Sequence, residues 1–398
     1  MSVNGRFALI NGRMSVNRRL PPIRLFAVTI AVLALLSRRS TTLWTFIDLS
    51  VYRSGAAQLL AQHSIYTGPA HRIGFTYPPF AALMFIPLQV IGEHPANVVM
   101  TLLSLVAFAV VVVVLGRELQ LPRWTTVVVA GLGGLALQPV QYNLWLGQIN
   151  LVLMALVLLD VFVLPRRFRG VLIGIAAGIK LTPGVFLLYY ILRRDGAAAR
   201  RTVISFVVTV ALGFTVAGAD SVRYWTQLFF DSNRIGDIVF GDNQSIYGVM
   251  ARVFHTSQPP RVLYLALSFA TISLAVLAAR RQLAQGSDLG AVVCLAVGGL
   301  LVSPVSWSHH WVWLVPALLI WFDRRQSVLA MLGAVTTFLA PMYFTPLGGD
   351  KEFGHVWWQA VACASYVLVG LVFLISMLTT SQRHTAARAV DQGALSST

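Results

Sequence analysis

The chain has 398 residues, of which 57% are hydrophobic and only 11% are charged, and its formal net charge is +16. Several continuous apolar runs approach the roughly 20 residues that a helix needs to cross a hydrocarbon core, which excludes a water-soluble fold. Because the runs do not alternate with polar residues, they predict membrane helices rather than a β-barrel. In a membrane protein an excess of basic residues marks the loops that face the cytoplasm, so the positive charge does not indicate that the protein binds nucleic acid.

Twelve apolar runs follow one another along the chain. They lie at 23–37, 80–92, 96–116, 124–138, 148–164, 170–193, 202–219, 261–279, 289–302, 309–322, 326–342 and 356–378. The first run has four arginines before it and a fifth, Arg24, at its start, and it leads into Ser37–Arg39 without a small-residue cleavage site, so we expect an uncleaved helix rather than a removed signal. If all runs crossed in turn, the arginine cluster at 166–169 would face outside, against the positive-inside rule.

Two of these runs are predicted to enter the membrane and return to the same side. The run at 80–92, opened by Pro78 and Pro79, is short for a span. The run at 170–193 has arginines at both ends and a break at 180–183. With these two re-entrant helical hairpins, about ten full spans remain. The predicted fold is an all-α polytopic membrane bundle whose basic residues mostly face the cytoplasm.

The chain is expected to form one transmembrane domain over 1–398, because it shows no internal repeat and no domain boundary. We expect the protein in the plasma membrane with both termini cytoplasmic, as a basic N-terminal tail at 1–22 and a C-terminal tail at 379–398. Two long extracytoplasmic loops are expected at 38–79 and 220–260.

This topology gathers the polar clusters that interrupt the apolar runs on the outer side of the membrane. Six separate segments contribute, at 48–53, 75–80, 147–150, 180–183, 242–245 and 303–310. Polar groups that converge on one face of a membrane bundle are what an active site or a substrate gate requires.

Asp48 stands where the first outer loop begins an amphipathic segment. One interpretation is a helix N-cap, because aspartate accepts hydrogen bonds from the first free backbone amides. The other is a general base at the membrane face, where flanking Ile47 and Leu49 limit hydration and raise its basicity. The two roles are compatible.

Lys180 is an ammonium group in an otherwise apolar run, which requires a partner or an anionic ligand. A lipid phosphate is the favoured ligand, and snorkelling to the surface is the alternative. Adjacent His309 and His310 would point about 100° apart on a helix, so they cannot chelate one metal as an i, i+4 pair could. Either histidine could donate to a phosphate or a sugar hydroxyl, and flanking Trp307 could equally be an interfacial anchor.

Two further segments could contact a sugar. Gln148 and Asn150 place two amides at the outer mouth of a helix, where they would bind sugar hydroxyls or cap the helix. Tyr77 precedes two prolines, whose simpler role is a rigid corner before the chain enters the membrane.

The sequence lacks a P-loop, a Rossmann glycine fingerprint and an acidic DxD pair that would hold a nucleotide sugar through a metal. Neither a metal nor another cofactor is therefore expected. A sugar donor used on the outer face should be lipid-linked.

Taken together, these motifs resemble the actinobacterial polyprenol-phosphate-mannose-dependent α-mannosyltransferases, glycosyltransferase family 87, which have the GT-C membrane fold. The resemblance covers most of the chain and rests on Asp48–Tyr52, Phe75–Leu83, Gly147–Leu151, Ile179–Pro183, Asn243–Ser245 and Ser303–His310. One departure is that Ile246, Tyr247 and Gly248 follow the Asn-Gln-Ser segment where the family often has a basic residue, although Arg252 lies near.

The resemblance implies transfer of mannose from polyprenyl-phosphate-mannose to a lipid-anchored mannoside, such as a phosphatidylinositol mannoside or lipomannan, and makes Asp48 the expected base. The expected acceptor group is a 2-hydroxyl, which gives an α-1,2 linkage. A β-linked donor and an α-linked product mean inversion, which needs one base and no carboxylate pair. The donor phosphate is expected to bind Lys180, His309, His310 and Arg53, and the sugars to contact Tyr77, Gln148, Asn150, Asn243, Gln244 and Trp307.

Two alternatives remain open from the sequence. A lipid or sugar transporter would use Lys180 and Asp160 as intramembrane sites on a translocation path. A sister glycosyltransferase would use a polyprenyl-linked pentose in place of mannose.

Overall fold

The structure is a computed structural model that describes residues 44–66, 74–231 and 233–379. Within these ranges the chain is helical, without strands, and carries one isolated antiparallel bridge between Asn243 and Trp307. The predicted first span at 23–37, the N-terminal tail at 1–22 and residues 380–398 of the predicted C-terminal tail lie outside the described residues. The predicted all-helical class is confirmed for the part that the structure describes.

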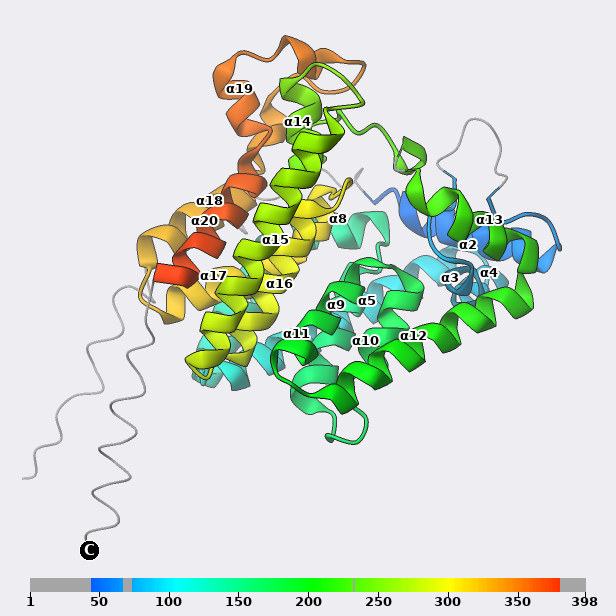
Figure 1. Ribbon diagram of the computed structural model, residues 1–398, viewed down its shortest axis with the longest axis horizontal. Coiled ribbons are helices and arrows are strands. Elements are labelled where there is room, and N and C mark those ends of the chain that lie inside the picture. The colour runs from blue at the N-terminus through cyan, green and yellow to red at the C-terminus, as the bar shows by residue number, and fades with distance from the viewer. Residues whose placement is uncertain (1–43, 67–73, 232, 380–398) are drawn as a thin grey trace, which may run out of the picture.

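The first part of the chain, up to α12, folds into a series of helices (Figure 1). They are α2 (Ile47–Leu60), α3 (Pro79–Met84), α4 (Ile86–Val90), α5 (Glu93–Glu118), α6 (Arg123–Thr125), η3 (Thr126–Leu132), α7 (Gly133–Ala136), α8 (Gln138–Leu146), α9 (Asn150–Leu158), η4 (Leu159–Val163), α10 (Val171–Ile179), η5 (Thr182–Phe186), α11 (Leu187–Leu192) and α12 (Gly196–Val216). Of these, η3 and η4 are π-helical and η5 is a 3-10 helix.

The second part continues across the molecule with α15 and α16 packed side by side (Figure 1). Its elements are α13 (Gly218–Thr226), η6 (Leu228–Phe230), η7 (Asn233–Ile235), α14 (Ile246–Val253), α15 (Arg261–Ala284), α16 (Asp288–Val302), η8 (Ser308–Trp313), α17 (Leu314–Asp323), α18 (Ser327–Leu339), η9 (Pro341–Phe344), η10 (Lys351–Gly354), α19 (Trp357–Ala362) and α20 (Ser365–Thr379). The predicted outer loop at 220–260 therefore contains several short helices.

Three helices of the described chain are by themselves long and apolar enough to cross a membrane, namely α5, α12 and α15. Their outer faces expose large apolar side chains, including Val106, Val207 and Phe269. Extended apolar faces of this kind are stable against lipid and not against water, so the chain is a helical membrane protein. The other apolar runs are built from shorter or bent helices, and the predicted ten spans stay a prediction.

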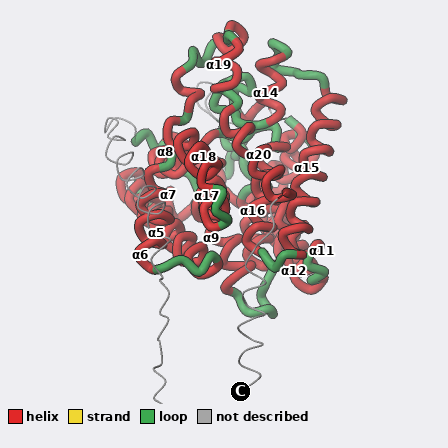
Figure 2. Tube along the Cα trace, turned by 90° about the vertical axis from the view of Figure 1, so that its left-hand side faces the viewer, coloured by secondary structure: helices red, strands yellow, loops and turns green. Residues whose placement is uncertain are grey.

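The two runs predicted as re-entrant hairpins are both broken helices. The first is split into α3 and α4 at Phe85, and both pieces are too short to cross a membrane. The second is split at Lys180, which is extended (φ −145°, ψ 130°) between α10 and η5. The turn between α11 and α12 lies at one end of the molecule, and α14 and α19 lie at the other (Figures 1 and 2).

Glycines bring α10 into close contact with α12. A Cβ atom at Gly174 would lie 1.9 Å from Ser205 Oγ, and one at Gly178 would lie 2.1 Å from Thr209 Oγ1. Small residues spaced four apart allow two membrane helices to approach each other closely. This packing fixes the position of α10 and, with it, of the break at Lys180.

Asp160 joins the two ends of the broken hairpin. Its carboxylate accepts hydrogen bonds from the backbone N–H groups of Gly170 (2.6 Å), Leu172 (2.7 Å) and Ile173 (3.2 Å), which begin α10. It also accepts a hydrogen bond from the hydroxyl of Tyr190, in α11. Asp160 therefore accepts hydrogen bonds from the free backbone amides at the start of α10 and, through Tyr190, holds α11 beside α10.

Replacing this carboxylate should destabilise the bundle. In Asp160→Ala several buried donors lose their acceptor, and we expect a loss of at least about 3 kcal/mol in the free energy of unfolding. Thermal unfolding of the purified protein in detergent measures it, with Glu118→Ala at an exposed helical site as the control. An Asp160→Ala variant as stable as the control would contradict this role.

Candidate active site

The beginning of α2 is held against the end of α8. The backbone N–H of Phe46 donates to the carbonyl oxygen of Trp145 (3.0 Å), and Phe46 itself takes a left-handed conformation (φ 45°). Gly147 ends α8 with φ 65°, and a Cβ atom there would lie 2.8 Å from Leu49 Cβ. Glycine is therefore required at this position both by the backbone and by the close approach of α2.

This packing places Asp48 beside Gln148. Asp48 lies in the first turn of α2, which has no side-chain cap, and its Oδ2 accepts a hydrogen bond from Gln148 Nε2 (3.0 Å). His309 Nε2 lies 3.9 Å from the same oxygen. Gln148 Oε1 accepts from the hydroxyls of Tyr52 and Tyr77 (3.2 Å to Tyr77), which fixes the orientation of the amide. The carboxylate is 22% exposed, so a substrate hydroxyl can reach it.

Lys180 lies on the other side of the histidine pair. Its Nζ donates to Asn150 Oδ1 (2.9 Å), lies 3.1 Å from His310 Nε2, and stands 5.4 Å from the centroid of the Tyr77 ring. The ion pairs found in the described residues do not include Lys180. A partly buried ammonium group whose direct contacts are uncharged is suited to an anionic ligand.

His309 and His310 connect these two charged groups. Their rings are nearly perpendicular (88°), with centroids 4.6 Å apart, and His309 faces Asp48 while His310 faces Lys180. The side-chain amides of Asn143 and Asn150 donate to the carbonyl oxygen of His309 and hold this turn in place. Among the described residues, no three His, Cys, Asp or Glu side chains are grouped so as to hold a metal ion.

The environment of Asp48 favours a proton acceptor that works near neutral pH. This residue belongs to the predicted outer loop and not to a membrane span. Burial raises the pKa of its carboxyl group to about 6, although the charge of Lys180 and the hydrogen bond from Gln148 act in the opposite direction. A general base is most effective when its pKa is close to the working pH.

Arg53 does not lie with this cluster. Its Nε donates to the carbonyl oxygen of Leu88 (3.1 Å), and Nη1 lies 4.0 Å from Glu93, so it joins α2 to α4 and α5.

Three further predicted sugar contacts act as supports behind the cluster. Asn243 donates to the carbonyl oxygens of Ile238 and Pro304, and Gln244 donates to those of Gly241 and Cys363. Trp307 forms the isolated bridge with Asn243, and its ring packs edge-on to Phe240. These residues fasten the predicted second outer loop to the segment that leads into His309.

The side chain of Arg252 also makes its hydrogen bonds within the protein. Its guanidinium group is buried and donates to the carbonyl oxygens of Val239, Phe240, Asn243 and Cys363. It therefore stabilises the loop rather than presenting a charge at the cluster.

Sequence reasoning missed two groups beside the cluster. Tyr52 follows Asp48 by four residues, so both lie on one face of α2, and this spacing is a signal that could have revealed it. Asp242 is only 4% exposed, and it accepts a hydrogen bond from the Tyr343 hydroxyl, which lies 3.1 Å from Ser308 Oγ. Nothing in the local sequence distinguishes Asp242 from a solvated loop residue. It braces Ser308, directly before His309.

The sequence model of glycosyltransferase family 87 matches residues 75–304. The chain belongs to glycosyltransferase family 87. This result confirms the family expected from the motifs. A comparison with solved structures found no match.

Curated relatives agree with this membership. The chain is 38% identical to the polyprenol-phosphate-mannose-dependent α-(1-2)-phosphatidylinositol mannoside mannosyltransferase of Mycobacterium tuberculosis, over 87% of this chain and 88% of the relative. The protein of the same name from Mycolicibacterium smegmatis is 35% identical, with 85% of each chain covered. A phosphatidylinositol pentamannoside mannosyltransferase of M. tuberculosis is 32% identical, over 86% of this chain and 83% of the relative.

Replacing Asp48 with asparagine tests it as a base. Asparagine keeps the size of the side chain but cannot accept a proton at neutral pH, so we expect turnover to fall roughly 10² to 10⁴-fold. The measurement is kcat with matched expression and thermal stability. Asp237→Asn, at an exposed site in the predicted second outer loop, is the control. Near-normal turnover in Asp48→Asn would exclude the base.

The pH profile of the unmodified enzyme gives a second test. Only the ionised carboxylate accepts a proton, and its pKa is raised to about 6. We therefore expect kcat/KM to be constant above this pH and to fall with falling pH below it. A decline that begins only near the pKa of a solvated aspartate, about 4, would show that burial does not tune the base.

Proposed function

We propose that the chain is an inverting mannosyltransferase that moves mannose from polyprenyl-phosphate-mannose to the 2-hydroxyl of a lipid-anchored mannoside, at the outer face of the plasma membrane. The observation that carries this proposal is the arrangement of two charged groups on either side of an adjacent histidine pair: the accessible carboxylate of Asp48, and Lys180, which forms no ion pair with a carboxylate of the described residues. The relatives are named for this donor and for phosphatidylinositol mannoside acceptors.

The reaction is a single displacement at the anomeric carbon of the donor. Asp48 takes the proton of the acceptor hydroxyl, whose oxygen forms the new bond while the bond from the anomeric carbon to the phosphate oxygen breaks. The departing lipid phosphate keeps the electron pair of that bond. Lys180, with Asn150 and His310 at its side, stabilises the negative charge.

The carboxylate of Asp242, which is near Asp48, is not placed to take part in the reaction, and this supports a mechanism with a single base. Asp242 is buried and accepts a hydrogen bond from Tyr343, so it is held away from a substrate. A retaining enzyme would need a second carboxylate close to the first as a nucleophile. Gln148, in contrast, donates to Asp48 and stabilises its ionised form.

The orientation in the membrane belongs to this proposal, with one transmembrane domain, both termini cytoplasmic and outer loops at 38–79 and 220–260. It is supported by arginines that meet at one place: Arg201 donates to the carbonyl oxygens of Arg166 and Arg169. The positive-inside rule assigns such a group to the cytoplasm. Asp48 lies on a separate segment that packs against α8.

The transporter alternative is less well supported. Asp160 would have to take part in a translocation path, yet its oxygens are used by the backbone of α10 and by Tyr190. Membership in a glycosyltransferase family also favours transfer.

A donor assay with a Lys180→Ala variant tests the proposal. Purified protein receives labelled polyprenyl-phosphate-mannose or a polyprenyl-linked pentose, together with a phosphatidylinositol mannoside, and the lipid products are separated. We expect mannose to be transferred, and Lys180→Ala to lower kcat/KM for the donor roughly 10²-fold because a charge partner of the phosphate is lost.

Lys351→Ala removes the charge of an exposed lysine and is the matched control. Transfer of the pentose alone would identify the sister enzyme. Unchanged kcat and KM in Lys180→Ala would show that Lys180 does not bind the donor phosphate, and would favour the alternative that its ammonium group snorkels to the membrane surface.

A further inference from the structure

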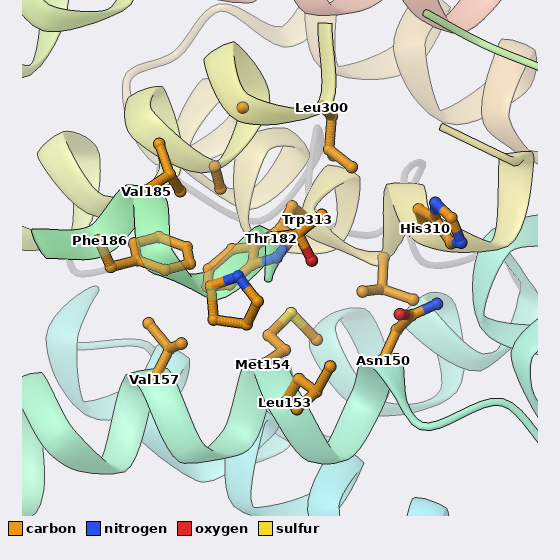
Figure 3. Close-up of a pocket in the computed structure, with 14 residues that line it drawn as sticks. Asn150, Leu153, Met154, Val157, Thr182, Val185, Phe186, Leu300, His310 and Trp313 are labelled. Atoms are coloured by element: carbon orange, nitrogen blue, oxygen red, sulfur yellow. The ribbon is translucent and has the colours of Figure 1, made fainter. Parts of the chain in front are cut away.

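A cleft extends from the phosphate side of the candidate site into the bundle. It lies between α9, η5, α16 and η8, and Asn150 and His310 line one of its ends. In Figure 3 these two side chains lie together, while Phe186 and Val157 lie at the opposite end. Met154 and Leu300 lie between the ends, so the cleft becomes apolar as it leaves the polar pair.

We propose that this cleft receives the first isoprene units of the donor lipid. The inference rests on the proposed function and adds the path of the lipid chain. Asn150 and His310, which form the polar end of the cleft, are also the two side chains that Lys180 contacts (2.9 and 3.1 Å). A phosphate bound at Lys180 would therefore have its ester-linked chain at the mouth of the cleft.

The dimensions and lining of the cleft fit a prenyl chain. Asn150 and Val157 are seven residues apart on one helix, which corresponds to about 10 Å of groove. The walls between them offer methyl, thioether and aromatic groups, which suit a branched hydrocarbon. Gly299 in α16 and Val185 in η5 both line the cleft, and a Cβ atom at Gly299 would lie 3.4 Å from Val185 Cγ1, in ordinary contact, so a larger side chain there would occupy part of the cleft.

The cleft is expected to direct the donor rather than to supply binding energy. Membrane lipid is as apolar as the walls of the cleft, so moving the chain from lipid into the cleft gains little from the hydrophobic effect. Fixing the chain limits the positions of the phosphate, and a misplacement of about 1 Å can reduce the rate strongly. The acyl chains of the acceptor are the other candidate occupants, but they belong to the substrate whose sugar approaches Asp48, whereas the cleft begins at Asn150 and His310, the two side chains that Lys180 contacts.

The test fills the cleft and varies the donor chain. Gly299→Leu places a branched side chain between α16 and Val185, and Gly299→Ala adds a single methyl group in ordinary contact. Gly131→Leu is the control, because a Cβ atom there has no neighbour closer than 3.8 Å. Each protein receives mannosyl phosphates that carry a methyl, geranyl or decaprenyl group.

In the unmodified enzyme and in the control, we expect kcat/KM to rise roughly tenfold from the methyl to the geranyl donor as the cleft is occupied. In Gly299→Leu this rise should disappear, and in Gly299→Ala it should be smaller. A misfolded Gly299→Leu is recognised by a lower thermal unfolding temperature in detergent, and Gly299→Ala then carries the test.

An equal rise in Gly299→Leu and the control would overturn the cleft as the site of the prenyl chain. An equal fall with all three donors, or a change confined to the KM of the acceptor, would also overturn it. If the unmodified enzyme transfers mannose from none of the donors, both this inference and the proposed function fail.

Discussion

The candidate site depends on the orientation of one amide, that of Gln148. Its oxygen accepts hydrogen bonds from Tyr52, Tyr77 and the backbone of Ile149, so its nitrogen must face Asp48. Three donors on one oxygen leave no stable flipped arrangement. The carboxylate is thereby held toward His309 while its surroundings keep it basic. Burial alone would raise the pKa of Asp48 without fixing the orientation of its carboxylate. The hydrogen bond from Gln148 fixes that orientation, so a substrate hydroxyl must approach the base from one side.

The opposite wall of the site is built by helix packing. Glycines let α10 approach α12, Asp160 anchors both ends of the broken hairpin, and the break at Lys180 is held between them. Asn150 and His310 then give the ammonium group neutral partners. Neutral partners leave its charge available to an anion, which an ion pair with a carboxylate would not. The apolar cleft that begins at the same two residues offers a place for the chain of a lipid phosphate.

Sequence reasoning predicted the helical class, the family and the break at Lys180, because these follow from apolar runs, ordered motifs and proline placement. The sequence does not distinguish a side-chain amide that faces a ligand from one that fastens a loop. Gln148 and Gln244 were therefore both predicted to contact a sugar, although Gln244 fastens a loop. Arg53 follows Asp48 by five residues, which turns it roughly 140° away around α2. Asp242 was missed because its burial depends on contacts with Tyr343 and Ser308, far along the chain.

The most direct measurement is the position of the donor phosphate. A structure of the protein with a non-transferable phosphonate analogue of polyprenyl-phosphate-mannose would show it. The account predicts the phosphonate against Lys180 Nζ, with Asn150 and His310 beside it and the anomeric carbon facing Asp48. A phosphonate bound at Arg53, or in a passage that opens at the arginine-rich end of the molecule, would contradict the account.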